Sequence, residues 1–350
     1  MRRITASLRA LLLMATALLL AACGEKTGGE TSKIAGETMG TTWHVSIAQK
    51  LDAPAQAALQ QRIDSALEAV NNSMSTYREQ SELMRYNHNP ATTPQPVSDG
   101  LRRVIGKALE ISVQSDGVYD ITVGPLVNLW GFGPVKRQDK PSDAEIAEAL
   151  QHIGYGKLQL TDAGLAKNDP QVFIDLSSIA KGYGVDVVAE TLLDGGYTNF
   201  IVEIGGEVRA SGSKYGAPWR VGIERPEQGL ATGEGVENII AMNAKLPAMA
   251  TSGNYRQYAE RGGEMAYHIV DPRDGRSHSS RLLSATVLAP DCMTADGYAT
   301  ALMVLGDEKA LEFADRYGLA AELILAGDDK QPFIIERSRA FRAAIQEEKP

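Results

Sequence analysis

The pattern of apolar residues changes at about position 199, and this change limits the folds open to the chain. Before it, apolar residues recur every three or four positions over 59–70 and 101–109, and a capping box at Ser142–Glu145 predicts a further helix. One early strand is expected over Thr41–Ile47, and a strand end that leads into a helix over Asp175–Asp194. After it, turns rich in Gly and Pro separate short predicted strands, which are Phe200–Ile204, Trp219–Ile223, Val236–Ala241, Ala266–Val270 and Ala285–Ala289.

Helices return near the end of the chain. They are predicted at about 293–305 and 307–317, and a short strand over Glu322–Leu325 follows. Helices and strands thus alternate irregularly, without repeated strand–helix–strand units. This order favours an α+β fold over a doubly wound parallel sheet.

Length and charge exclude several classes of protein. With 350 residues, 43% of them hydrophobic, the chain can form one large domain or two closely packed lobes with a buried core. Its 44 acidic and 35 basic residues give a net charge of −9, so we do not expect a broad basic surface for nucleic acid. Two cysteines and five histidines exclude a disulfide-stapled scaffold and a cysteine-rich zinc site.

The N-terminus resembles a bacterial lipoprotein signal. Arg2, Arg3 and Arg9 precede an apolar run, Ala10–Ala22, whose thirteen residues are too few to cross a hydrocarbon core about 30 Å thick. The run ends in Leu20-Ala21-Ala22-Cys23, which resembles a lipobox, where the chain is cleaved before a cysteine that carries diacylglycerol. The alternative is a plain secretory signal with a chance cysteine.

We therefore expect a signal peptide over 1–22, a lipid on Cys23, a flexible polar tether over 23–33 and a globular domain over 34–350. Cleavage would remove three arginines and no acidic residue, which changes the net charge from −9 to −12. We expect the mature protein at the periplasmic face of a bacterial membrane, with the choice of inner or outer membrane left open.

The common signatures of nucleotide-binding and hydrolase folds are missing from the sequence. It contains no Gly-x-x-x-x-Gly-Lys-Ser/Thr loop, no Gly-x-Gly-x-x-Gly after a strand and no Gly-x-Ser-x-Gly elbow. His-Glu-x-x-His and Cys-x-x-Cys are also missing. Any chemistry must therefore come from less common arrangements.

Two segments combine residues that suit a nucleotide. Residues 117–133 place four glycines and three aromatic residues around Asp120, which suits a flat heterocycle, although composition alone favours a packed aromatic loop. Residues 175–186 place Asp175, two serines and Lys181 at a helix start. This arrangement suits a cation or a phosphate, and it also suits a simple helix cap.

Two further segments carry single candidate groups. Asp296 and Thr300 lie on one helix face, about 6 Å apart, and could bind a hard cation such as Mg²⁺, although such a pair is usually just exposed. His268 starts a segment that runs from a predicted strand into a tight turn at 271–275. A histidine on an apolar strand is by default a core residue with satisfied hydrogen bonds.

Taken in order, these segments resemble the motifs of one family. The motifs are Met39–Thr42, Ser75–Tyr77, Tyr119–Leu126 with Trp130–Gly133, Asp175–Tyr183, Glu203–Gly206, Thr251–Gly253, His268–Pro272 and Ala295–Leu302. Together they closely resemble the ApbE family, the FAD:protein FMN transferases, over about residues 34–335. The resemblance implies an α+β fold related to the T-fold, with mixed and antiparallel sheets and packed helices in two intimate lobes.

The resemblance also implies roles for individual residues. The residues implied to contact the flavin nucleotide are Met39, Tyr77, Val118, Tyr119, Asp120, Asp175, Lys181 and Val270. A magnesium site is implied at Asp296 and Thr300, with a backbone or hydroxyl oxygen from Ser178. Some family members have a second acid just before that threonine, where this chain has Ala299.

The implied activity is Mg²⁺-dependent transfer of the FMN moiety of FAD onto a threonine or serine hydroxyl of an acceptor protein, with release of AMP. The implied acceptors are extracytoplasmic subunits of redox-driven ion pumps and related electron-transfer proteins. We take His268 as the candidate base for the hydroxyl proton. Two alternatives stay open: an Mg²⁺-dependent FAD pyrophosphatase that gives FMN and AMP, and a flavin-binding lipoprotein without turnover.

Overall fold

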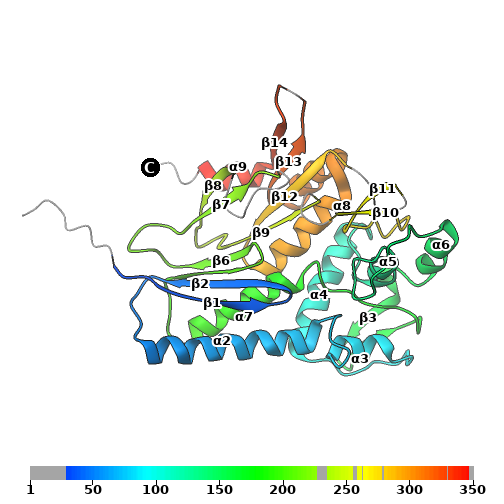
Figure 1. The fold of residues 1–350 in the computed structure, drawn as a ribbon, viewed down its shortest axis with the longest axis horizontal. Coiled ribbons are helices and arrows are strands. Elements are labelled where there is room, and N and C mark those ends of the chain that lie inside the picture. The colour runs from blue at the N-terminus through cyan, green and yellow to red at the C-terminus, as the bar shows by residue number, and fades with distance from the viewer. Residues whose placement is uncertain are drawn as a thin grey trace, which may run out of the picture.

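A computed structural model describes residues 29–226, 235–254, 258–261, 263–277, 280–328 and 330–346. The predicted signal peptide and Cys23 lie outside these residues. The fold is α+β, as predicted: a large antiparallel sheet packs against long helices, and a helix-rich part lies beside it (Figure 1).

Eight of the described strands form one sheet in the order β1-β2-β5-β6-β9-β12-β13-β14, and every neighbouring pair is antiparallel. The other described strands form the ribbons β3–β4, β7–β8 and β10–β11. The strands are β1 (Ser32–Thr38), β2 (Thr41–Ile47), β3 (Leu158–Thr161), β4 (Gly164–Lys167), β5 (Phe200–Ile204), β6 (Glu207–Ser211), β7 (Arg220–Glu224), β8 (Val236–Ala241), β9 (Ala248–Gly253), β10 (Tyr258–Arg261), β11 (Glu264–Tyr267), β12 (Leu282–Ala289), β13 (Ala320–Ala326) and β14 (Phe333–Arg337).

The helices begin where the sequence supplies side-chain caps. Ser142 and Glu145 form the predicted capping box at the start of α6, and Ser98 caps α4. The helices are α2 (Ala53–Met74), α3 (Glu82–His88), α4 (Asp99–Gln114), α5 (Gly124–Leu129), α6 (Asp143–Gln151), α7 (Ala180–Asp194), α8 (Cys292–Tyr317) and α9 (Arg339–Gln346), with short 3₁₀ helices η1 (Ile121–Val123) and η2 (Tyr155–Lys157). The break predicted at 306 within the last long helical region is present in α8, because Gly306 has a left-handed φ of 73°.

The large sheet is covered on both faces. Helices α2, α4, α7 and α8 pack on one face, and the β7–β8 ribbon and α9 pack on the other. Along β12, Val287 packs toward the helices, whereas Leu288 packs toward Trp219 and Phe341 on the opposite face. Strands buried on both faces do not alternate apolar and polar residues, so β9 and β12 carry a weak strand pattern.

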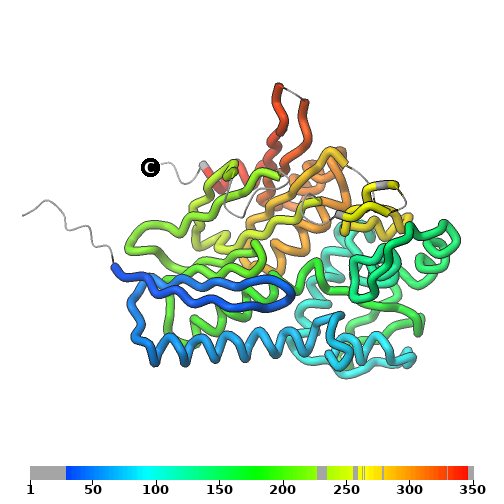
Figure 2. The backbone as a smooth tube through the Cα atoms, viewed as in Figure 1, coloured from blue at the N-terminus to red at the C-terminus, as the bar shows by residue number. Residues whose placement is uncertain are grey.

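The N-terminal hairpin brings the start of the chain into the sheet. Strand β2 pairs with β5, which lies more than 150 residues later in the sequence, and Figure 2 shows the blue hairpin of β1 and β2 lying against green segments of the chain. Ser32 and Lys33, which we expected to end the tether, instead pair with Ile47 and Ser46 as the first residues of β1. The side chain of Ser32 is buried and accepts a hydrogen bond from the Leu51 amide at 2.8 Å.

The strand predicted over Ala266–Val270 was wrong in its second half. Strand β11 ends at Tyr267, and His268, Ile269 and Val270 lie in a loop. At the end of β11, the Ser277 hydroxyl accepts a hydrogen bond from the Tyr267 amide and donates one to the Tyr267 carbonyl oxygen. The chain after Tyr267 thus bonds back to the strand through a side chain instead of continuing a strand ladder.

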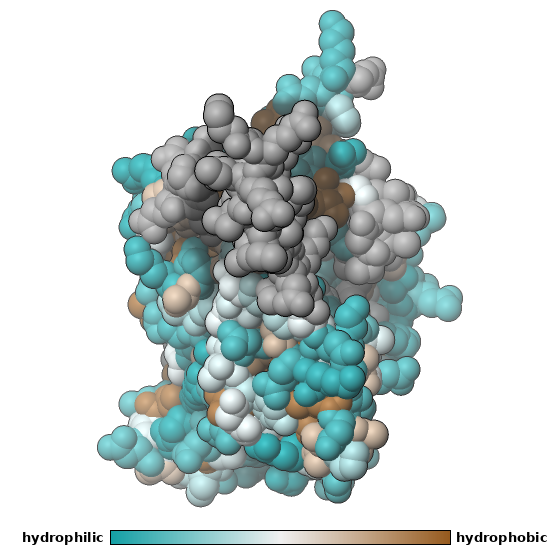
Figure 3. Space-filling model, turned by 90° about the vertical axis from the view of Figure 1, so that its left-hand side faces the viewer, coloured by the Kyte–Doolittle hydropathy of each residue, from teal (hydrophilic) through white to brown (hydrophobic). Residues whose placement is uncertain are grey.

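The surface of the described residues does not indicate a membrane-spanning segment. None of the described helices is long and apolar enough to cross a membrane. On the face in Figure 3, hydrophobic residues are scattered among hydrophilic ones wherever the structure is described.

Helices α7 and α8 are joined by one buried carboxylate. Asp186 of α7 is fully buried and accepts hydrogen bonds from the amides of Cys292 and Met293, at 3.0 and 2.9 Å, in the first turn of α8. It also forms an ion pair with Arg209 of β6 at 2.7 Å. One side chain thus links two helices and the sheet.

Replacing Asp186 with Ala should therefore destabilise the fold. The variant leaves Arg209 and two buried amides without their acceptor, which should lower the free energy of unfolding by about 3–5 kcal/mol. Chemical denaturation measures the loss, and Glu190→Ala is the control. Glu190 lies on the same helix in an exposed ion pair with Arg103, so its loss should cost less than about 1 kcal/mol. Equal costs for the two variants would contradict the role of Asp186.

Candidate active site

Lys181, Glu207 and Asp296 meet where α7, β6 and α8 come together. The Lys181 ammonium donates to Oε1 of Glu207 at 2.5 Å, and Oδ2 of Asp296 accepts the Gly182 amide at 2.8 Å. Both acidic residues are 2% exposed, whereas the Lys181 side chain is 32% exposed. The partly exposed lysine can therefore reach a ligand, while the buried carboxylate of Glu207 holds it from the protein side.

The geometry of this cluster depends on Gly182. A Cβ atom at this position would lie 2.4 Å from the Cys292 carbonyl oxygen and 2.8 Å from Cβ of Asp296. Only glycine allows α7 and α8 to approach this closely. The close approach brings the Gly182 amide to Asp296 and places the neighbouring Lys181 beside β6.

Burial and mutual charge set the protonation of the cluster. Burial raises the pKa of Glu207 to about 7, although the positive charge of Lys181 opposes this shift. Burial likewise raises the pKa of Asp296, again against Lys181. For Lys181, burial acts to lower the pKa, but Glu207 and Asp296 raise it overall. Lys181 is therefore protonated at neutral pH.

Tyr119 connects this cluster to two other predicted segments. Its hydroxyl is 2.9 Å from Oγ of Ser178, and its side chain is buried. Burial raises the pKa of Tyr119, and the nearby charges of Asp296, Asp175 and Asp120 raise it further. The predicted residues of three separate segments thus lie around one tyrosine.

Thr300 lies one turn after Asp296 on α8, as predicted. Its hydroxyl is 3.1 Å from Oγ of Ser252, the last residue but one of β9. The predicted magnesium residues therefore combine one buried carboxylate with hydroxyl groups. Among the described residues, no group of three or more His, Cys, Asp or Glu side chains that could hold a metal is present.

Asp120 has a structural position that its sequence context did not reveal. Its Oδ1 accepts hydrogen bonds from the amide and the hydroxyl of Thr122, and its Oδ2 accepts the Tyr155 amide at 2.6 Å. The carboxylate therefore caps η1 and fixes the loop before α5. Any contact between Asp120 and a ligand would compete with these bonds.

Tyr77 and His268 both contact Phe132. The Tyr77 hydroxyl donates to the Phe132 carbonyl oxygen at 3.3 Å, and the Tyr77 side chain is 65% exposed. The rings of Phe132 and His268 meet edge to face with their centres 6.4 Å apart. Burial and the charge of Asp175 raise the pKa of Tyr77, so Tyr77 also lies near Asp175.

The side chains of the remaining predicted flavin residues pack against other parts of the protein. Met39 has a positive φ of 51° in the β1–β2 turn and packs against Gly184 of α7. Val118 and Val270 are buried at 5% exposure, and Val270 packs in a small core with Trp130. Their side chains belong to the core, which supports the alternative that the aromatic segment around Trp130 is a packed loop.

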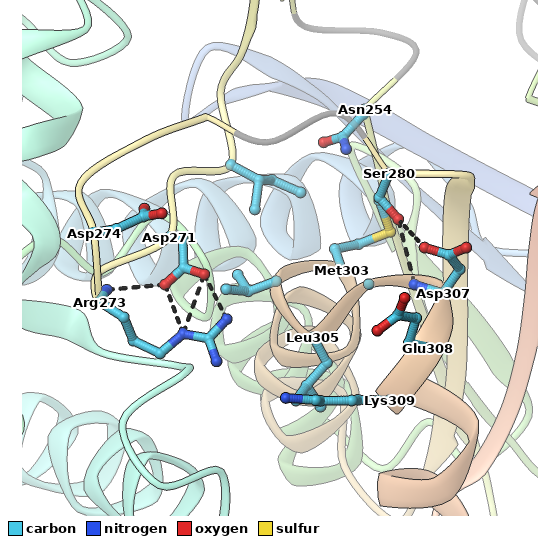
Figure 4. A pocket seen from close by; sticks show the side chains of 13 residues that line it. Asn254, Asp271, Arg273, Asp274, Ser280, Met303, Leu305, Asp307, Glu308 and Lys309 are labelled. Carbon is cyan, nitrogen blue, oxygen red and sulfur yellow. Dashed lines mark hydrogen bonds and ion pairs between the residues drawn. The ribbon is translucent and has the colours of Figure 1, made fainter.

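A cavity of about 370 Å³ lies beside the His268 loop (Figure 4). Asp271 and Arg273 form an ion pair on one wall, and Met303, Asp307 and neighbouring residues around the α8 kink form the other. None of the residues predicted for the flavin or the metal lines it, although Ile269 and Asp271 on either side of Val270 do.

The structure therefore brings most of the predicted site residues into one region and adds Glu207, which we did not predict. The sequence carries only a weak signal for Glu207, an acidic residue directly after Gly205-Gly206, because polar and apolar residues alternate along the strand that it begins. Lys181 and Glu207 are 26 residues apart, so their contact depends on the fold.

Comparisons with known proteins identify the family. The sequence model of the ApbE family matches residues 39–323. A Haemophilus influenzae protein called FAD:protein FMN transferase is 44% identical over 338 residues, which cover 94% of this chain and 95% of that protein. A Vibrio cholerae protein of the same name is 43% identical and covers 91% and 94%.

Solved structures agree with the sequence relatives. The flavin transferase ApbE from Vibrio cholerae matches with a TM-score of 0.79 and 41% identity, over 90% of this chain and 99% of that one. The apo form of the Pseudomonas stutzeri flavinyl transferase ApbE matches with a TM-score of 0.81 and 34% identity, over 92% and 99%. The motifs in the sequence, the fold and these relatives all lead to one conclusion: the chain belongs to the ApbE family.

Proposed function

We propose that this chain transfers the FMN moiety of FAD onto a threonine or serine hydroxyl of an acceptor protein and releases AMP. The acceptor oxygen forms a bond to the phosphorus of the FMN half, the bond from that phosphorus to the oxygen bridging to AMP breaks, and the hydroxyl proton leaves. The observation that carries the proposal is the protonated Lys181, which is hydrogen-bonded to Glu207 and attracted by the charge of Asp296, where the family's motifs meet. The relatives named FAD:protein FMN transferase support it.

The residues present fit a divalent cation. Asp296 is buried, and among the described residues none donates a hydrogen bond to its Oδ1. Hydroxyl oxygens of Thr300 and Ser178 are the other groups that would hold Mg²⁺, a cation that prefers such hard oxygen ligands. When bound, Mg²⁺ would supply neutralisation of charge on the pyrophosphate oxygens.

The chain's own residues would orient the nucleotide and remove a proton. Lys181 offers a fixed positive charge to the phosphates, and the exposed ring of Tyr77 offers an aromatic face to the isoalloxazine. His268 is half-buried in a loop, where its ring meets the ring of Phe132 edge to face. We assign it the role of general base for the acceptor hydroxyl.

Incubation with FAD, Mg²⁺ and an acceptor protein tests this function against the two alternatives. Transfer predicts AMP together with flavin that stays on the acceptor under denaturing conditions. Free FMN with AMP would instead indicate a pyrophosphatase, and unchanged FAD a flavin-binding protein without turnover. Chromatography of the small molecules distinguishes the three.

We further propose that the protein acts at the periplasmic face of a bacterial membrane, held by a lipid on Cys23, on extracytoplasmic subunits of redox-driven ion pumps. The lipobox-like sequence before Cys23 supports this location. Diacylglycerol supplies two acyl chains, enough for stable attachment where one chain gives only marginal binding.

Replacing Cys23 with Ser should release the protein from the membrane or leave an uncleaved precursor. Fractionation without detergent, followed by mass measurement of the N-terminus, checks this. Wild-type protein found wholly in the soluble fraction would contradict lipid attachment.

Replacing Asp296 with Ala should abolish Mg²⁺ binding and slow transfer at least about 100-fold. Metal coordination is worth several kcal/mol of charge stabilisation, and each 1.4 kcal/mol changes a rate tenfold. Titration calorimetry and single-turnover transfer measure the two effects. Glu312→Ala, an exposed acid on the same helix, should leave both unchanged. Full activity of Asp296→Ala at ordinary Mg²⁺ would remove the metal assignment.

Replacing His268 with Ala should lower the rate of transfer by about 10²–10⁴-fold, the usual contribution of a placed base. FAD affinity should change little, since the imidazole is assigned to the acceptor side. His44→Ala is the control, because His44 is exposed and paired with Glu203 on the sheet. Normal single-turnover transfer with a lowered melting temperature would show instead that His268 is structural.

A further inference from the structure

The buried cluster contains two carboxylates and one ammonium, and the ammonium is bonded to only one of the two. Lys181 donates to Glu207 at 2.5 Å, whereas the bond to Asp296 comes from the Gly182 amide at 2.8 Å. The charges of Glu207 and Asp296 both act on Lys181, so either carboxylate attracts it. Of the two carboxylates, Glu207 is therefore the one that binds the ammonium.

Whether Lys181 bonds to Glu207 or to Asp296 determines whether the Asp296 carboxylate is available to a cation. A lysine bonded to Asp296 would occupy and neutralise the carboxylate that a cation needs. Held by Glu207, the ammonium leaves Asp296 with its negative charge and an oxygen that no described residue donates to. A side chain on β6 thus holds a lysine on α7 that a carboxylate on α8 also attracts.

Glu207 is also an incompletely bonded buried group. Its Oε2 is buried and has no hydrogen-bond partner among the described residues. Most buried polar atoms are hydrogen-bonded, so this oxygen is an exception, which among the described carboxylates it shares with Oε1 of Glu322. Replacement of a purely structural buried pair by neutral groups is often tolerated, whereas removal of one partner is not.

We infer that Glu207 is a positioning residue of this site: it holds Lys181 toward the phosphates and keeps it off Asp296, so that Asp296 is available to a divalent cation. This inference rests on the proposed function for the identity of the ligands. Glu207 itself touches neither the cation nor FAD in this role.

The test measures Mg²⁺ binding without FAD and without turnover. In Glu207→Gln, the lysine should turn to Asp296 and weaken Mg²⁺ binding at least about tenfold, as titration calorimetry measures. A crystal structure of the variant should show the Lys181 ammonium within hydrogen-bond distance of Asp296. In Lys181→Met/Glu207→Gln, which removes the pair and keeps the net charge, Mg²⁺ affinity should return to within about threefold of wild type.

A matched control separates position from charge. Glu203→Gln also removes one negative charge, from the strand that pairs with β6, but Glu203 contacts His44 and the Gly206 amide instead of Lys181. Its Mg²⁺ affinity should stay within about twofold of wild type.

Several results would overturn the inference. The first is an unchanged Mg²⁺ affinity in Glu207→Gln. The second is a weakened affinity in that variant while the Lys181 ammonium still contacts the side chain of residue 207. The third is a double variant that binds Mg²⁺ as weakly as Glu207→Gln does. If Glu207→Gln fails to fold, the double variant alone is sufficient, because a loss beyond about tenfold there contradicts the inference. Wild-type protein that does not bind Mg²⁺ would instead contradict the metal proposal, and the crystal structure would still test where Lys181 goes.

Discussion

The close contact of α7 and α8 at Gly182 is the constraint on which the rest of the structure depends. The two helices are close enough there that a Cβ atom would overlap the Cys292 carbonyl group. On one side of the contact, Asp186 binds the first turn of α8 and joins it to β6 through Arg209. On the other side, the Gly182 amide holds Asp296. The residues that pack α7 against α8 are therefore the same ones that position the candidate active site.

Buried carboxylates in this protein differ in how completely they are bonded. Incomplete bonding does not by itself mark a functional group, because Oε1 of the fully buried Glu322, which pairs with Arg337, also lacks a partner among the described residues. Asp120 and Asp186 each accept at least three hydrogen bonds or ion pairs, and both fix helix starts. Asp296 accepts one amide, and Glu207 has a buried oxygen without a described partner. Because an unsatisfied buried acceptor costs stability, its presence at this junction favours a ligand-binding role.

Local signals in the sequence predicted the elements that depend on local interactions. The capping box of α6 and the strands Phe200–Ile204 and Val236–Ala241 were confirmed, since caps and turns specify them within a few residues. Strand β9 was not predicted, because its burial arises from partners that are distant in the sequence. Strand β1 was not predicted either: it mostly alternates buried and exposed residues, but its first two residues, Ser32 and Lys33, were assigned to the tether. The pair Asp296 and Thr300 was predictable from helical spacing. The cap made by Asp120 and the contact of Glu207 with Lys181 were not, since both require segments that only the fold brings together.

The central claim is that this arrangement moves FMN from FAD to an acceptor hydroxyl, and the mass of the acceptor tests it most directly. After incubation with the enzyme, FAD and Mg²⁺, intact-mass measurement should show one added FMN group less one water. Fragmentation should place the added mass on a threonine or serine side chain. An acceptor that keeps its original mass while FAD is converted to free FMN and AMP would contradict the claim.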